Sequence, residues 1–310
     1  MILTLTLNPA VDINYKLDKL KLNGVTRCSD VTKTAGGKGL NVSRVISLAG
    51  EDVCATGFLG GSNGELIKKH LKEQGLANQF VEISGATRNC IAMLHDNQQT
   101  EILETGPAIS KLEQNKFIDE FQELLTNCEI IAASGSLPQG IATDFYAQLV
   151  DIANQNNKKF ILDTSGQALK EALPAKPYLI KPNQEELEQL FNQQITKQFE
   201  LITALEELKK YKIPIIVISL GAEGLLAADK NKIYKIIPPQ IDLSNPVGSG
   251  DATIAGFAVG LKRGWGIEEV LKYGCTLGTL NAREEKTGYI NSDKIEDYLA
   301  QIKLEVIKEL

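Results

Sequence analysis

The sequence predicts an α/β protein built on a mainly parallel sheet. From residue 110 to about residue 225, short apolar runs of strand length alternate with longer segments of helix periodicity, which is the order of successive βα units. In addition, two glycine-rich turns, at residues 35–42 and 245–252, each run directly into a helical pattern. With 310 residues the chain is long enough for one large domain of this class or two smaller ones.

The N-terminal part is expected to supply a strand and then a small accessory sheet. Leu3, Leu5 and Leu7 alternate with threonines until Pro9 ends the run, which is a strand pattern. Residues 13–35 are polar and lack helix periodicity, so they are compatible with short strands. Residues 88–95 and 99–104 have the pattern of a hairpin.

The remaining elements are expected in alternation along the chain. The expected helices are two that end at Gly50 and Gly75 and others at residues 111–125, 143–155, 184–191, 200–211, 254–261, 267–284 and 293–308. The expected strands are residues 52–58, 129–133, 160–163, 178–180 and 215–219. The last two helices are expected to pack as ordinary amphipathic helices.

The composition argues against several classes of function. The net charge of −6 disfavours nucleic acid as a partner, because phosphate contacts require a basic surface. Five scattered cysteines without a C-x-x-C pair fit reduced thiols in a cytoplasmic protein. No leader is visible, and no apolar run approaches the roughly 20 residues of a membrane helix, so no membrane partner is expected. Only two histidines occur, which gives little support to a histidine metal site or a Ser-His-Asp hydrolase.

The turn at residues 245–252 can be interpreted as a catalytic anion site. Gly248 and Gly250 flank Ser249, so the backbone can bend sharply and expose successive N–H groups at a helix start. Asp251 follows at once and could accept a proton from an attacking hydroxyl. The alternative is structural: Asp251 is a first-turn acid favoured by the helix dipole, after two turn glycines.

The turn at residues 35–42 places Lys38 and Asn41 at the mouth of another helix. It is not a phosphate-binding loop of the Walker A type, because G-x-x-x-x-G-K-[ST] is absent. A lysine between glycines at a helix start suits an anionic or hydroxyl-rich ligand, whereas the alternative is a tight turn with a solvated lysine. The glycines at 57, 60, 61 and 64 do not form G-x-G-x-x-G, so a nicotinamide site is disfavoured.

Several polar residues are predicted to share one cleft, because each lies just past a predicted strand and parallel strands end at a common edge. They are Asp12, Ser136, Asp163, Lys181, Asn183 and Gly221. Two further features stay open. Arg88 is either a surface charge or a bidentate clamp on a phosphate. Asn183 and Glu186 either steer a hydrated Mg²⁺ or form an ordinary capping box.

The two glycine turns together give the sequence a family resemblance. It resembles the ribokinase-like sugar kinases of the phosphofructokinase-B family. The resemblance rests on residues 36–42 and 246–251, supported by residues 134–138, 181–186 and 219–224 in the family's order. It implies one doubly wound kinase domain over residues 1–310. It also implies a small β-sheet lid inserted from about 13–35 and 88–105.

The resemblance also implies roles for individual residues. Asp251 would be the base, and the N–H groups of Gly248, Ser249 and Gly250 would form an anion hole. The residues that would hold sugar hydroxyls are Asp12, Gly37, Lys38 and Asn41. The residues that would hold a phosphate already on the sugar are Arg27, Arg88 and Ser136. The ATP site would be lined by Lys181, Asn183, Ser219, Gly221, Gly224 and Asn281, with Glu186 acting on Mg²⁺ through water.

The activity implied is ATP-dependent phosphorylation of a ketohexose monophosphate in the cytoplasm, with Mg²⁺ and with dimerisation through the lid. Within that family, residues 33–39 and 87–92 most resemble the members that act on tagatose 6-phosphate, which implies tagatose 1,6-bisphosphate as the product, as in lactose or galactose catabolism. The alternative acceptor is fructose 1-phosphate. A monovalent cation beside residues 242–245 stays open. An alternative of another class is a catalytically silent sugar-phosphate sensor, which the intact Asp251 and glycine turn disfavour.

Overall fold

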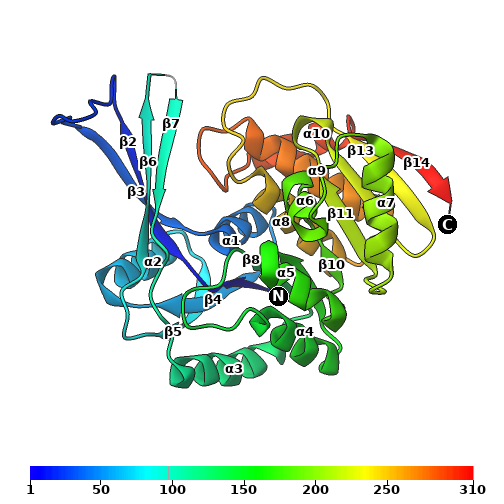
Figure 1. The fold of residues 1–310 in the computed structure, drawn as a ribbon, viewed down its shortest axis with the longest axis horizontal. Helices are drawn as coiled ribbons and strands as arrows, with labels where there is room; N and C mark the ends of the chain where they lie inside the picture. Colours follow the sequence, from blue (N-terminus) through cyan, green and yellow to red (C-terminus); the bar gives the residue numbers. More distant parts are fainter. Residues whose placement is uncertain (97, 310) are drawn as a thin grey trace.

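A computed structural model describes residues 1–96 and 98–309 and shows two sheets of very different size (Figure 1). The large sheet has ten strands in the order β14-β13-β12-β11-β10-β9-β8-β1-β4-β5. Its strands are β1 (Ile2–Thr6), β4 (Val53–Leu59), β5 (Ala77–Glu82), β8 (Ile130–Ser134), β9 (Lys159–Asp163), β10 (Leu179–Ile180), β11 (Ile215–Ser219), β12 (Leu225–Ala228), β13 (Lys232–Ile237) and β14 (Lys303–Glu309). Strands β5 to β11 of this order pair in parallel, which confirms the predicted doubly wound α/β class.

Helices cover both faces of the large sheet, and each face has its own apolar core. One core joins the sheet to α1 (Lys38–Leu48), α2 (Gly61–Glu73), α8 (Ser249–Lys262), α9 (Ile267–Ala282) and α10 (Ile295–Leu299). The other core joins it to α3 (Lys111–Leu125), α4 (Phe145–Gln155), α5 (Gly166–Ala172), α6 (Gln184–Phe191) and α7 (Gln198–Lys209). Both faces of the central strands are therefore buried, as is typical of parallel sheets.

Strand β1 shows how its alternating sequence serves these two faces. Leu3 and Leu5 pack in the core on the α3 side. Thr4 faces α1 instead, where its hydroxyl lies 2.6 Å from that of Ser43. Helix α1 lies so close to β1 that a Cβ on Gly39 would be 2.3 Å from the Leu5 carbonyl oxygen. The small residue at this position therefore sets the distance between the first turn of α1 and the end of β1.

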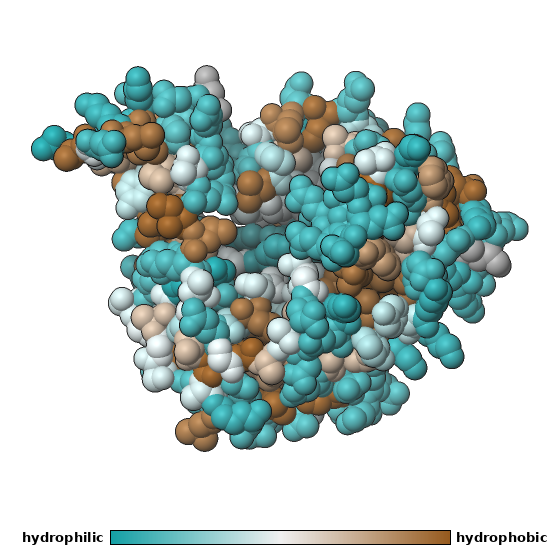
Figure 2. All heavy atoms as spheres, viewed as in Figure 1, coloured by the Kyte–Doolittle hydropathy of each residue, from teal (hydrophilic) through white to brown (hydrophobic). Residues whose placement is uncertain are grey.

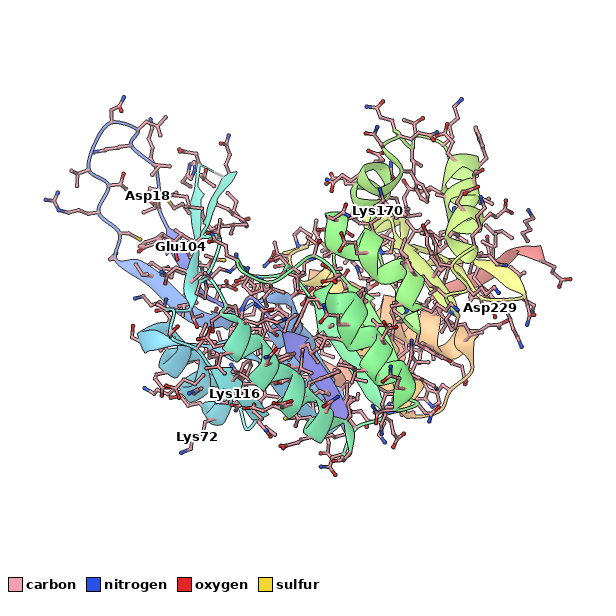
Figure 3. The ribbon with its side chains drawn as sticks, turned by 60° about the horizontal axis from the view of Figure 1, so that its bottom comes forward. Asp18, Lys72, Glu104, Lys116, Lys170 and Asp229 are labelled. Atoms are coloured by element: carbon pink, nitrogen blue, oxygen red, sulfur yellow. The ribbon has the colours of Figure 1, made fainter. Side chains whose placement is uncertain are left out.

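The small sheet stands away from the large one, at one edge of the molecule (Figures 1 and 3). Its order is β3-β2-β6-β7, from β2 (Ala10–Lys16), β3 (Asp30–Gly36), β6 (Arg88–His95) and β7 (Gln98–Leu103). It is mixed, because β2 pairs in parallel with β6 and the outer pairs are antiparallel. These strands overlap the two ranges predicted for a lid, 13–35 and 88–105, but β2 begins three residues earlier, at Ala10; residue 97 lies outside the described residues. Figure 3 shows Asp18, just past β2, and Glu104, just past β7, well away from Lys72 on α2 and Lys116 on α3.

One predicted helix is wrong. Residues 293–308 form the short helix α10 and then β14, which pairs antiparallel with β13 at the edge of the large sheet. The segment 303–309 is rich in lysine and glutamate, which favour helices. Its backbone nevertheless pairs with β13, for example Leu304 with Ile236, and the hydrogen bonds to that strand outweigh the helix preference. Within the described residues, no helix is long and apolar enough to cross a membrane.

Candidate active site

Polar side chains gather at the carboxyl ends of the parallel strands, where the strand order reverses. Strand β1 lies between β4 and β8, so later strands are added outward on both of its sides. Asn8 follows β1, Ser136 follows β8, and Asp163 ends β9. Ligands of open α/β sheets bind at such a reversal. Figure 2 shows a hollow between the small sheet and the larger body of the molecule.

The two glycine turns meet in this region. Helices α1 and α8 lie side by side in Figure 1, and both begin next to the ends of the central strands. Asn41, in the first turn of α1, donates a hydrogen bond of 2.7 Å from Nδ2 to Oδ2 of Asp251 in α8. The turns predicted to hold acceptor and donor are 210 residues apart in sequence and in direct contact in space.

Asp251 is a buried carboxyl group with polar neighbours. Its side chain is 5% exposed. Burial raises its pKa from 3.8 to about 6, against the opposing effects of the Lys38 charge and the Asn41 hydrogen bond. A carboxyl group with this pKa is largely ionised at pH 7 and still basic enough to accept a proton. It can therefore serve as a general base.

A second buried carboxylate, Asp163, joins two lysines. Its Oδ2 lies 3.8 Å from the Lys38 ammonium and its Oδ1 lies 3.2 Å from that of Lys181. Asp163 and Lys181 are 2% and 5% exposed, whereas Lys38 is about half exposed. The Asp163 charge raises the pKa of Lys38. Two cations thus stand beside the start of α8, where a Cβ on Gly250 would lie 3.4 Å from Lys181 Nζ.

The turn before α8 presents backbone donors to the same space. Gly248 has a positive φ of 86° that suits glycine, and a Cβ there would lie 2.8 Å from Thr287. The N–H of Ser249 donates to the Pro246 carbonyl at 3.2 Å. The N–H groups of Gly250 and Asp251 have no acceptor among the described residues. The Gly248 N–H likewise has no acceptor there, so the donors available at this helix start are Gly248, Gly250 and Asp251, and the Ser249 amide is already used.

The predicted sugar-binding residues surround the start of α1. A Cβ on Gly36 would lie 2.1 Å from the Asp12 carboxyl carbon, so glycine at this position leaves room for that side chain. Burial raises the Asp12 pKa to about 6, against the nearby charges of Arg44 and Arg88. Gly37, with φ of 115°, precedes α1 as its N-terminal cap. Asp12 on β2 and the α1 residues thus come from both the small sheet and the main domain.

Arg88 lies at the base of the small sheet and is already held by backbone carbonyls. Its Nε and Nη2 donate to Asn8 O at 3.3 and 3.1 Å, and its Nη1 donates to Glu104 O at 2.7 Å. Asn8 Nδ2 in turn donates to the Ser136 hydroxyl at 3.3 Å. Arg88 also lines a hollow of about 530 Å³ with residues 84–86 and 104–108. Arg88 and Ser136 therefore belong to one cluster.

Arg27 does not join that cluster. It lies exposed in the loop between β2 and β3, and within the described residues no hydrogen bond or ion pair links it to another side chain. Its contact with the sugar phosphate stays a prediction, because within a single chain Arg27 lies away from Arg88 and Ser136.

The predicted nucleotide residues lie after β10 and β11 and near the end of α9. They are Lys181, Asn183, Glu186, Ser219, Gly221, Gly224 and Asn281. Asn183 and Ser219 form a parallel bridge, which joins two of these segments. A Cβ on Gly221 would meet no atom within 4 Å, so this position is open, whereas Gly224 is packed against Ile236 O. Asn281 is fully buried, and its amide bonds the backbone of Val247 and Gly288 at 3.0 and 2.9 Å. Asn281 therefore links the turn before α8 to the loop at residue 288.

The Asn183–Glu186 pair forms the capping box that was the structural alternative. Asn183 Oδ1 accepts from the Glu186 N–H at 2.8 Å, and Glu186 Oε2 accepts from the Asn183 N–H at 2.9 Å. Glu186 nevertheless interacts with the charges of the site: burial and then the Asp163 charge raise its pKa, and the charges of Lys38 and Lys181 lower it. Glu186 can therefore cap α6 and still face a ligand in the site.

A magnesium ion fits this part of the site on chemical grounds. Two carboxylates, Asp163 and Glu186, repel one another there. Asp163 Oδ1 accepts no hydrogen bond of good geometry among the described residues, although Lys181 is near. Hard oxygen ligands of this kind suit hydrated Mg²⁺. Within the described residues, no cluster of three histidine, cysteine or carboxylate side chains forms a ready-made metal site.

Two residues of the site had no predicted role. Asp163 was placed in the shared cleft, but its pairing with two lysines depends on contacts across three segments. Arg44 was not singled out at all. Its position three residues after Asn41 on the same helix places both on one face, which was the available signal.

The chain belongs to the pfkB family of carbohydrate kinases, since the model of that family matches residues 5–294. It is an enzyme, an ATP-dependent sugar kinase. It is 48% identical over 307 residues to a tagatose-6-phosphate kinase of Staphylococcus epidermidis, covering 98% of this chain and 99% of the relative.

Two solved structures of an Escherichia coli enzyme have the same fold. Phosphofructokinase-2 in complex with potassium is 28% identical, with a TM-score of 0.90 and coverage of 96% of this chain and 98% of that one. Phosphofructokinase-2 in complex with fructose 6-phosphate is 27% identical, with a TM-score of 0.88 and the same coverage.

Proposed function

We propose that the protein transfers the γ-phosphoryl group of ATP to tagatose 6-phosphate and forms tagatose 1,6-bisphosphate. The observation that carries this proposal is the 48% identity over nearly the full length to a tagatose-6-phosphate kinase. The site supports it. The Arg88 guanidinium and the Ser136 hydroxyl both bond Asn8 after β1, and together they would bind the phosphate already on the sugar. Two further cations, Lys38 and Lys181, lie next to the helix start for the phosphate in transfer.

In this proposal Asp251 accepts the proton of the attacking sugar hydroxyl. Its burial raises its pKa toward the working pH, and its hydrogen bond to Asn41 fixes one carboxylate oxygen. The other oxygen would then be left to accept the proton from the sugar. Asp12 and Asn41 would orient the acceptor hydroxyl. Because the two reactants are then held in place, the transfer becomes effectively unimolecular.

The charge that builds up on the moving phosphoryl group would be balanced by the α8 turn. The free N–H groups of Gly250 and Asp251 and the Lys181 ammonium stand together at this helix start, with the Gly248 turn before them. Donors fixed in a low-dielectric site stabilise such charge without reorganisation. Lys38 would stay close to the phosphoryl group during its transfer. Its side chain is half exposed, and among the described residues its ammonium is held only by the pair with Asp163.

Mg²⁺ would be held through water by Glu186 and Asp163, and it would neutralise charge on the ATP phosphates. Asn183, Ser219, Gly221 and Gly224 would line the ATP site, and Asn281 would act indirectly by holding residue 247. A monovalent cation beside residues 242–245 stays a prediction. It is supported by the potassium complex of the E. coli phosphofructokinase-2.

The small sheet would act as a lid over the sugar and as the surface of a homodimer. Its exposed apolar side chains, Val31, Ile102 and Leu103, support the dimer. A dimer would also give Arg27 a neighbouring chain to contact. The cytoplasmic location stays a prediction from five free, scattered cysteines.

The proposal is tested by a coupled assay of ADP formation with MgATP and each of three acceptors: tagatose 6-phosphate, fructose 6-phosphate and fructose 1-phosphate. We expect the largest kcat/KM with tagatose 6-phosphate. A larger value with fructose 1-phosphate would reassign the substrate, and no turnover with any acceptor would support the silent-sensor alternative. Product identity is checked by mass and by ³¹P NMR, since both phosphates of tagatose 1,6-bisphosphate are primary esters.

A further inference from the structure

Arg44 is a charged residue in the middle of the site that the proposed function leaves without a role. It lies on α1, where burial lowers its pKa and the charges of Asp12 and Asp251 oppose that effect. A buried guanidinium costs free energy unless it is paired and hydrogen-bonded. The contacts that it makes should therefore show what it does.

Arg44 bonds two acceptors that belong to different parts of the molecule. Its Nη1 donates to the Ala35 carbonyl of β3 at 2.8 Å. Its Nη2 donates to Oδ1 of Asn41. The planar guanidinium donates these bonds from two nitrogens at a fixed spacing, whereas a lysine would have to reach both acceptors from a single nitrogen. Arg44 thus links the last strand of the small sheet to the side chain that bonds Asp251.

The bond to Asn41 decides which way that amide faces. With Oδ1 held by Arg44, the Nδ2 group points at Asp251 and donates to its Oδ2 at 2.7 Å. The flipped amide would set Nδ2 against the guanidinium and Oδ1 against the carboxylate, so both pairs would repel. Without Arg44, only Asp251 itself would select the orientation, and a protonated Asp251 could donate to the flipped amide.

We propose, on the basis of the proposed function, that Arg44 is a positioning residue. It holds the Asn41 amide in the orientation that supports the ionised Asp251 carboxylate. It acts on the base through Asn41 and touches neither substrate. Arg44 also bonds Ala35 of β3. Three successive hydrogen bonds, from Ala35 to Arg44, Asn41 and Asp251, therefore connect the small sheet to the base.

Other groups also bear on Asp251 and are kept constant in the test. Lys38 on α1 and Lys181 after β10 favour its ionised form, and Asp163 on β9 disfavours it. None of these is bonded to Arg44 among the described residues. Hence a change at Arg44 should reach Asp251 through Asn41 and through its own charge.

The test compares Arg44→Gln, Asn41→Ala and the double variant through the acid limb of kcat against pH. The sugar's phosphate ionises in the same range, so one acceptor is used for all variants. Loss of a hydrogen bond to the ionised base should raise the midpoint of the limb by about one pH unit. We expect each single variant to show this rise and the double variant to rise no further than the larger single one. The loss of kcat is then large at pH 6 and small at pH 8.5.

Arg263→Gln is the matched control. Arg263 at the end of α8 also bonds a backbone carbonyl, Ala49 O at 3.0 Å, and a side chain, Glu51 at 2.7 Å. It should leave the midpoint unchanged. An unchanged midpoint in Arg44→Gln, or a double variant that shifts by the sum of the two singles, would overturn the positioning role. If Arg44→Gln does not fold, Arg44→Lys replaces it: it keeps the charge, so a smaller rise of the midpoint is expected, and an unchanged midpoint again overturns the positioning role, because one ammonium nitrogen cannot occupy the positions of both guanidinium nitrogens.

The midpoint can also be read without turnover. In protein labelled with ¹³C at the aspartate carboxyl, the Asp251 resonance is the one missing from Asp251→Asn, and its titration midpoint should rise in Arg44→Gln. A wild-type protein that phosphorylates no ketohexose phosphate would end the proposed function. The resonance would still decide the role of Arg44, so the two failures are distinguishable.

Discussion

Replacement of Asp251 by asparagine should remove activity and add stability. The variant keeps the shape of the side chain, and its Oδ1 can still accept from Asn41 Nδ2. It has no basic oxygen for the sugar's proton. A general base contributes about 10²–10⁴-fold, so we expect kcat to fall by this factor, or about 3–5 kcal/mol in the barrier.

The stability change follows from the pKa of Asp251, which burial raises from 3.8 to about 6. The folded protein then binds the proton more tightly than the unfolded chain. The contribution of the carboxyl group to stability is full below pH 4 and is lost as the pH rises through 6. At pH 8 the ionised group costs ~1–3 kcal/mol, and the neutral asparagine avoids most of this cost. We expect Tm to rise by a few degrees at pH 8, with the difference vanishing near pH 4.

The assay is kcat in the coupled ADP assay together with thermal unfolding at pH 8 and pH 4. Asp297→Asn is the matched control, since Asp297 is an exposed acid in the first turn of α10. If Asp251 were only a first-turn acid, its loss would lower stability by about 0.3–1 kcal/mol and leave kcat alone. That pair of results, or a kcat near wild type, would refute the assignment of Asp251 as the base.

Three other changes test the rest of the site. Gly36→Ala should raise KM for the sugar about tenfold or more, because its Cβ would lie 2.1 Å from the Asp12 carboxyl carbon; Gly24→Ala, with its nearest atom at 3.4 Å, should change nothing. Arg88→Ala should raise KM for the sugar phosphate far more than KM for ATP, and equal effects would count against the phosphate clamp. Glu186→Gln should keep the capping box, and hence Tm, but raise the Mg²⁺ concentration needed for half-maximal rate; an unchanged requirement would leave Glu186 a cap only.

The elements that sequence reasoning predicted correctly are those whose signals are local. The alternation of helices and strands from residue 110 and the two glycine turns each lie within one short segment, so periodicity and turn chemistry suffice for them. The C-terminal strand β14 was missed because its residues favour a helix by themselves. Only the neighbouring ladder of β13, more than sixty residues earlier, makes this segment a strand.

The same division applies to the candidate site. Asp251 and Lys38 were found because each stands in a glycine turn at a helix start. The pairing of Asp163 with lysines 38 and 181 could not be predicted, since it brings together three segments through tertiary contacts. The burial of Asn281 behind the turn before α8 could not be predicted either, and its role at the ATP site stays a prediction.

The most direct test of the central claim is a crystal structure with tagatose 6-phosphate, Mg²⁺ and a non-hydrolysable ATP analogue. The account predicts that the free primary hydroxyl of the sugar lies within about 3 Å of an Asp251 carboxylate oxygen, with the γ-phosphate at the start of α8. A sugar bound with its free primary hydroxyl away from Asp251, or a γ-phosphate remote from Gly250, would contradict it.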